Sequence, residues 1–238
     1  RIVGIITGKI WEKIMKKKNF AFITILLVFS AMFVNAQNNE INRVEVFGGY
    51  SVKRADPGFA SEDIGTDFDT AFGKKQTAHG FNASITGNVS KYFGLKFDVS
   101  SHGKTFDTTF QGDQYNTKYS IQNFLGGFQV KNNKSEGSKV KPFFHALFGI
   151  ARQTTTTTTT STNLGATSLE RKQSNFAMAF GGGIDVKVHK RVDLRVFSVD
   201  YNPTYVKEQV FFPGTINEFA LDGKLQNNVR FGFGIVIH

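Results

Sequence analysis

The chain has 238 residues and contains no cysteine, so disulfide bonds cannot hold it together. Lysine and arginine outnumber the acidic residues by 29 to 19, which gives a formal net charge of +10. These basic residues do not form a cluster interleaved with aromatic residues. We therefore predict no nucleic-acid partner.

The N-terminal segment has the pattern of a secretory signal peptide. Three lysines at 16–18 are followed by an apolar run over 20–34 and by a small-residue triplet that ends at Ala36. The apolar run is shorter than the roughly 20 residues that a membrane-spanning helix needs. We predict a signal peptide over residues 15–36, cut between Ala36 and Gln37. A buried N-terminal helix is the alternative interpretation.

The segments on either side of this signal have different roles. Residues 1–14 precede Met15, and we interpret them as an upstream extension that is not part of the fold. Residues 1–36 carry half of the formal charge, a net of +5, so the mature part carries the other +5. That mature part, residues 37–238, has a length that fits a single all-β domain.

Apolar and polar residues alternate in eight segments of the mature chain, and no segment has a convincing helical period. Because successive side chains of a strand point to opposite faces, each segment has one apolar face and one small or polar face. In chain order the predicted strands cover residues 43–52, 78–89, 93–100, 117–130, 140–155, 175–189, 192–206 and 229–238.

Some segments depart from regular alternation. We predict a loop over residues 103–116 and a β-bulge near Gln122, where the phase of the apolar residues changes. A second change of phase is predicted within residues 192–206. The threonine run at 154–160 is interpreted as a β-favouring extension of a surface hairpin, with a low-complexity functional motif as the alternative.

The connections between the predicted strands alternate between long and short. The short ones fall near residues 90–92 and 190–191, and the one over 132–139 is of medium length. This asymmetry is typical of transmembrane barrels with an even number of strands. The sequence therefore predicts an all-β fold, an eight-stranded antiparallel up-and-down transmembrane β-barrel. A soluble barrel or sandwich is the alternative, with the apolar faces as its core.

Charged residues recur on the polar faces of the strands. In an eight-stranded barrel the lumen is only wide enough for side chains to fill it, so charges there must be paired. Four acids and four bases fit this requirement, whereas in a soluble sandwich they would form a solvated surface. The predicted lumen charge network, which would plug the barrel, consists of Glu45, Lys96, Asp98, Asp185, Lys187, Asp193, Arg195 and Arg230.

Aromatic residues flank the apolar faces at both ends of the predicted strands. Transmembrane barrels carry such girdles at both membrane interfaces. The predicted girdle near the short turns consists of Tyr92, Phe93 and Phe143, and the one near the long loops of Tyr50, Tyr119, Phe176, Tyr201 and Tyr205.

Several short motifs resemble those of the small OmpA-like outer-membrane β-barrel domain family. They are Phe47-Gly48-Gly49-Tyr50, Tyr92-Phe93-Gly94-Leu95, Gly181-Gly182-Gly183, Leu194-Arg195 to Asp200-Tyr201, and Arg230-Phe231-Gly232-Phe233-Gly234. The resemblance covers essentially all of residues 43–238. It implies insertion by the outer-membrane assembly machinery with the help of periplasmic chaperones, and both termini in the periplasm. We find no peptidoglycan-binding domain after the barrel, so cell-wall anchoring is not expected.

The sequence offers no convincing catalytic or metal site. Its five histidines are scattered without metal-ligand spacing, so no metal and no cofactor is predicted. Ser100 and His102 lie near Asp98 on a predicted lumen face, but a polar network is the preferred interpretation over a catalytic triad. Acidic residues at 63–69 and 105–107 are interpreted as solvated loop charge.

We therefore expect a monomeric, non-enzymatic protein of the outer membrane of a Gram-negative-type bacterium, in contact with outer-membrane lipid and lipopolysaccharide. Its expected role is structural or in surface interaction, through long external loops. A narrow porin-like channel is the main alternative. A lipid-modifying enzyme and a soluble periplasmic lipid-binding barrel are further alternatives.

Overall fold

A computed structural model describes residues 41–55, 76–110, 113–135, 138–161, 165–206, 209–211, 219–221 and 224–238. The predicted signal peptide, its cleavage site at Ala36 and Gln37, residues 1–14 and the acidic segment at 63–69 lie outside the described residues. Within the described ranges, no helix is long and apolar enough to cross a membrane.

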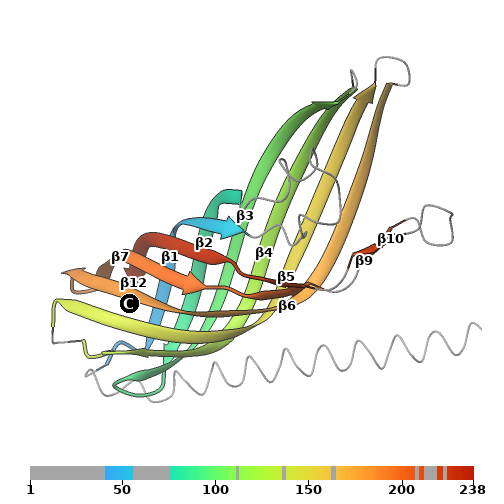
Figure 1. The fold of residues 1–238 in the computed structure, drawn as a ribbon. Coiled ribbons are helices and arrows are strands. Elements are labelled where there is room, and N and C mark those ends of the chain that lie inside the picture. The colour runs from blue at the N-terminus through green and yellow to red at the C-terminus, as the bar shows by residue number, and fades with distance from the viewer. Residues whose placement is uncertain are drawn as a thin grey trace, which may run out of the picture.

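Eight strands close into a ring (Figure 1). Around the ring the order is β6-β5-β4-β3-β2-β1-β12-β7, and pairing of β6 with β7 completes the circle. Every pairing within the ring is antiparallel. Each ring strand pairs with the ring strands before and after it in the chain, and the first, β1, pairs with the last, β12. The predicted eight-stranded antiparallel up-and-down barrel is confirmed. The ring strands are β1 (Val44–Ala55), β2 (Gln76–Asn88), β3 (Phe93–Phe110), β4 (Asp113–Lys131), β5 (Val140–Ser161), β6 (Gly165–His189), β7 (Val192–Tyr201) and β12 (Val229–Ile237).

Short strands continue two members of the ring. After β7 the chain is interrupted at Asn202 and Pro203 and resumes as β8 (Thr204–Val206), which pairs with β6 and with β11 (Lys224–Gln226). Proline has no N–H to donate to a ladder, which explains the break in the strand predicted over 192–206. A separate hairpin consists of β9 (Gln209–Phe211) and β10 (Phe219–Leu221).

The long strands β3, β4, β5 and β6 extend well beyond the others at one end of the barrel (Figure 1). The loop predicted over 103–116 is wrong, because β3 and β4 pair residue by residue out to Phe110 and Asp113. The predicted threonine extension is confirmed, since every residue of 154–160 pairs with β6. Both faces of a sheet that projects into water can be polar, so this part of the fold lacks the alternation that marks a half-buried strand.

The irregularities of the ring differ in part from the prediction. No bulge interrupts β4 near Gln122, because its register with β3 is continuous through Ile121. Ile121 turns inward and is buried, so an apolar residue on the inner row caused the apparent change of phase. The change of phase predicted in β7 is confirmed, since the register shifts there and the neighbours Val196 and Phe197 are both exposed.

The outer surface of the ring is apolar. The outward side chains include large exposed phenylalanine, leucine, isoleucine and valine residues, among them Phe144 at 70 %. Tyr92 and Phe93 lie exposed near the short turns, as predicted for a girdle. Phe143 is only 1 % exposed and points inward, so its assignment to that girdle is wrong. Tyr119 lies on the inward row of β4 with Ile121, so its assignment to the girdle near the long loops is also wrong.

Candidate functional site

The interior of the barrel is rich in charged side chains. Seven of the eight predicted network residues are at most 3 % exposed, namely Glu45, Lys96, Asp98, Asp185, Asp193, Arg195 and Arg230. Lys187 is the exception, because it is half-buried at the short-turn end and its Nζ donates to the Ser135 carbonyl at 2.7 Å. Four further charged residues are buried that the sequence analysis did not include, namely Lys53, Lys131, Lys141 and Asp200.

A central cluster is built around Arg230 of β12. Its Nη1 lies 2.9 Å from Asp98 Oδ1 on β3, and its Nε donates to Asp200 Oδ2 on β7 at 2.8 Å. His145 Nε2 on β5 lies 2.9 Å from the other Asp200 oxygen. Lys96 Nζ lies 3.4 Å from His145 Nδ1. The cluster therefore joins strands from several sides of the ring.

A second cluster, the turn-side cluster, lies toward the short turns. Lys131 Nζ donates to Glu45 at 3.0 Å and to Asp185 at 2.8 Å. Arg195 binds Asp185 with two hydrogen bonds, from Nε at 2.8 Å and from Nη2 at 3.1 Å. Asp193 accepts a hydrogen bond from Lys141 at 3.2 Å. The two hydrogen bonds between Arg195 and Asp185 pair their charges and also fix the relative orientation of the two side chains.

Two inward phenylalanine rings enclose Arg195. Its guanidinium carbon lies 4.2 Å from the centre of the Phe47 ring and 4.0 Å from the centre of the Phe143 ring. Arginine stacks on aromatic faces in this way, and the attraction is strongest where water is excluded. This layer, which we call the Phe-Arg-Phe layer, consists of Phe47, Arg195 and Phe143.

Glycines make room for the Phe-Arg-Phe layer. A Cβ added at Gly49 would lie 2.7 Å from Cζ of Phe47, and one added at Gly234 would lie 2.9 Å from Cε2 of the same ring. A Cβ at Gly183 would lie 3.0 Å from the Phe143 ring. The glycine motifs noted in the sequence therefore have a packing reason, because only glycine lets these rings turn inward.

Polar residues continue the interior toward the projecting end. Lys53 Nζ donates to Asn202 Oδ1 at 2.6 Å, and Ser51 Oγ lies 2.8 Å from His102 Nε2. Ser100 instead accepts from Asn123 at 3.1 Å. In the described part of the chain, His102 Nδ1 has no hydrogen-bond partner, so no acid orients this imidazole. The Ser100, His102 and Asp98 combination is not assembled as a triad.

Three of the four additional charged residues, the lysines, could have been found from the sequence. Glu45, Phe47, Gly49, Ser51 and Lys53 lie at spacings of two, so the inner row of β1 runs through Lys53. Lys131 extends the row of Gln129 in β4, and Lys141 begins the row of Phe143 and His145 in β5. All three lysines lie near strand ends, and Lys53 and Lys131 fell just outside the predicted strands over 43–52 and 117–130.

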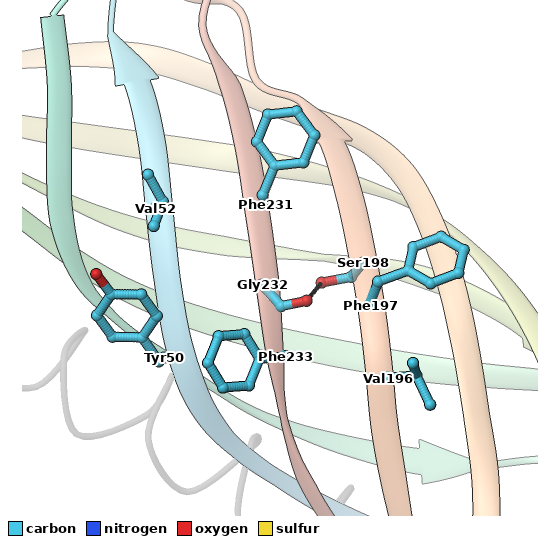
Figure 2. A pocket seen from close by; sticks show the side chains of 8 residues that line it. All are labelled: Tyr50, Val52, Val196, Phe197, Ser198, Phe231, Gly232 and Phe233. Carbon is cyan, nitrogen blue, oxygen red and sulfur yellow. Dashed lines mark hydrogen bonds between the residues drawn. The ribbon is translucent and has the colours of Figure 1, made fainter.

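The remaining features do not suggest a further site for chemistry. No group of three or more histidine and acidic side chains that could hold a metal ion occurs among the described residues. On the outside, a shallow apolar groove lies where β7 bulges beside β12 and β1. Figure 2 shows its lining of Tyr50, Val52, Val196, Phe197, Phe231 and Phe233 around the Ser198 hydroxyl, which donates to the Gly232 carbonyl at 3.3 Å.

A closed ring of eight antiparallel strands, apolar outside and ion-paired inside, defines a transmembrane β-barrel. The model of one protein family, described as outer membrane protein beta-barrel domain, matches residues 24–235. The chain belongs to this family.

The comparison with curated proteins finds no match. Three similar solved structures are small surface or outer-membrane proteins. The first is the attachment invasion locus protein Ail of Yersinia pestis, with 14 % identity over 82 % of this chain and 97 % of Ail, at a TM-score of 0.42. The second is Neisserial surface protein A, with 11 % identity over 82 % and 97 % of the two chains, also at 0.42. The third is the outer membrane protein OprG of Pseudomonas aeruginosa, with 14 % identity over 83 % and 96 %, at 0.49.

Proposed function

We propose that the protein is a non-enzymatic, monomeric barrel of the outer membrane, with a plugged polar lumen and a structural or surface-interaction role. In this proposal residues 15–36 are the signal peptide, residues 37–238 form the barrel domain, and residues 1–14 take no part. The barrel is inserted by the assembly machinery after transport by periplasmic chaperones. Lipopolysaccharide and outer-membrane lipid surround it.

The observation that carries the proposal is the cross-linking of the interior by ion pairs between distant strands. Arg230 of β12 reaches Asp98 of β3, and Lys131 of β4 reaches Glu45 of β1. Each of these side chains is at most 3 % exposed. Side chains suffice to fill a ring of eight strands, so such contacts favour a plug over an open pore.

Conductance in planar bilayers tests the plug. Folding is first verified by a shift in gel migration between boiled and unboiled samples. We expect the folded protein to show no single-channel steps above the background of empty detergent. Reproducible steps from the folded form would overturn the plug and support the narrow porin-like channel instead.

The projecting part of β3, β4, β5 and β6 supports a role at the cell surface. Its strands pair beyond the first residues of β2, with exposed side chains on both faces of β6 and half-buried threonines along β5. Shortening both hairpins, by deleting residues 104–118 and 153–173, should leave the heat-dependent gel shift intact. Cells with the shortened protein should lose adhesion or resistance to envelope stress. Unchanged adhesion and stress resistance would count against this role.

The non-enzymatic assignment has its own test. The serine and histidine pair, Ser51 and His102, is at most 1 % exposed and lacks an orienting acid among the described residues. We therefore expect the mass spectrum of lipid A to be the same with and without overexpression of the protein. A new lipid A species would overturn the assignment.

A further inference from the structure

The three short turns carry a group of exposed basic side chains at one end of the barrel. The turn between β2 and β3 contributes one, the turn between β4 and β5 contributes two, and the turn between β6 and β7 contributes two. We call this group the turn rim, and its members are Lys91, Lys134, Lys139, Lys190 and Arg191.

The turns form a continuous surface because they bind one another. The Asn133 N–H donates to the Lys91 carbonyl at 2.8 Å, which joins the first turn to the second. The Lys187 N–H donates to the Lys139 carbonyl at 2.7 Å, which joins the second to the start of the third. The five charges of the rim are therefore held on connected backbone rather than on independent loops.

The described acidic residues at this end lie inside the barrel rather than on the rim. Glu45, Asp185 and Asp193 all turn into the barrel and are at most 2 % exposed, where they pair with interior bases. The sequence of the turn between β4 and β5 also contains Glu136, which lies outside the described residues, so the three turns together carry five basic residues and one acidic residue. The described acids point inward and the turns keep an excess of basic residues, which favours a positive surface field at this end.

The rim lies at the level of the membrane interface. Tyr92 and Phe93 are exposed directly beside Lys91, whose Nζ lies 4.8 Å from the centre of the Tyr92 ring. Exposed Val140 and Val188 begin the apolar surface next to the other two turns. Aromatic residues of this kind occupy the headgroup region, and neighbouring lysines direct their ammonium groups to it.

We propose that the turn rim binds the phosphodiester headgroups of anionic phospholipids in the leaflet that surrounds the short turns. The position beside interfacial aromatics favours a lipid over an acidic protein or a cell-wall polymer, which would approach the rim from the aqueous side. The inference goes beyond the proposed function and depends neither on the plug nor on the projecting hairpins.

Binding of dioleoyl phosphatidylglycerol to the folded full chain in neutral detergent tests the inference, measured by native mass spectrometry. Phosphatidylcholine serves as the neutral lipid and inorganic phosphate as the soluble source of the same chemistry. The rim variant removes one charge per turn, Lys91→Gln, Lys134→Gln and Arg191→Gln. The matched control removes two lysines and one arginine from the projecting strands, Lys118→Gln, Lys172→Gln and Arg171→Gln.

We expect wild type to bind phosphatidylglycerol in preference to phosphatidylcholine, and more weakly as salt is raised. Each basic residue near an anionic lipid surface contributes about fivefold in binding, so the rim variant, which lacks three of them, should bind on the order of 100-fold more weakly. The control should stay within about threefold of wild type.

Four results would overturn the inference: equal binding of the two lipids, equal loss in both variants, full competition by inorganic phosphate, or co-sedimentation with isolated cell-wall sacculi without lipid preference. The gel shift of unboiled samples verifies that each variant is folded. If the triple variant does not fold, Lys91→Gln and Arg191→Gln are measured singly and should each weaken binding about fivefold.

Discussion

Replacement of Arg195 by lysine should destabilise the barrel although it preserves the charge. Lysine offers a single ammonium group, so one of the two hydrogen bonds to Asp185 is lost, at about 1.5–3 kcal/mol for a bond between charged groups. The flat contact with Phe47 and Phe143 is also lost, which adds about 1 kcal/mol. We expect a total loss of roughly 2–4 kcal/mol in the free energy of unfolding, a large part of the stability of a typical domain.

Equilibrium unfolding by urea in detergent, followed by far-ultraviolet circular dichroism, measures this loss. Arg191→Lys is the control, because Arg191 is exposed and should change stability by less than about 0.5 kcal/mol. A double-mutant cycle with Phe47→Leu isolates the ring contact and should give a coupling of about 1 kcal/mol. A loss below about 1 kcal/mol for Arg195→Lys, with no coupling to Phe47, would refute the reasoning.

Two further predictions concern the same interior. Arg230→Met removes the arginine partner of two buried carboxylates, Asp98 and Asp200, and should cost about 3–5 kcal/mol in urea unfolding, so a cost below about 1 kcal/mol would contradict a dry cluster. Gly49→Ala places a methyl group 2.2 Å from the Phe233 carbonyl oxygen and 2.7 Å from the Phe47 ring and should cost about 1–3 kcal/mol, whereas Gly48→Ala, with nothing within 4 Å, should change stability by less than about 1 kcal/mol. Equal effects at the two glycines, measured by the same unfolding, would show that the close approach is not what requires glycine.

The sequence predicted the ring because the period of two is strong wherever one face meets lipid and the other the interior. The prediction failed where the two faces of a strand do not differ in polarity. The projecting parts of β3 and β4 consist mostly of polar residues and have no continuous apolar row, and their strand pairing was predicted as a loop over 103–116. The predictions for Phe143 and Ile121 failed for the opposite reason. Both residues lie on the inner row, but they were expected on the outer surface because they are apolar.

The charge network was predicted in part for a related reason. Residues in the middle of strands, such as Asp98 and Arg230, were found from the alternation alone. Lys131 and Lys141 lie where strands run into a turn, and basic residues there have the same composition as an ordinary polar turn. Which carboxylate pairs with which base also depends on the stagger of the closed ring, and no alternation pattern contains that information.

The pairing of the first ring strand, β1, with the last, β12, has a consequence for the order of events during folding. Hairpins between consecutive strands can form early, but joining β1 to β12 must close a loop of nearly the whole domain, which is slow. The Arg230 to Asp98 and Lys53 to Asn202 contacts span 132 and 149 residues, so they cannot form before that closure. A sheet that has not yet closed would therefore expose unpaired charges to lipid, at a high cost in free energy. We expect the closure of β1 with β12 to be cooperative for this reason. Few half-closed barrels should then be present in the membrane.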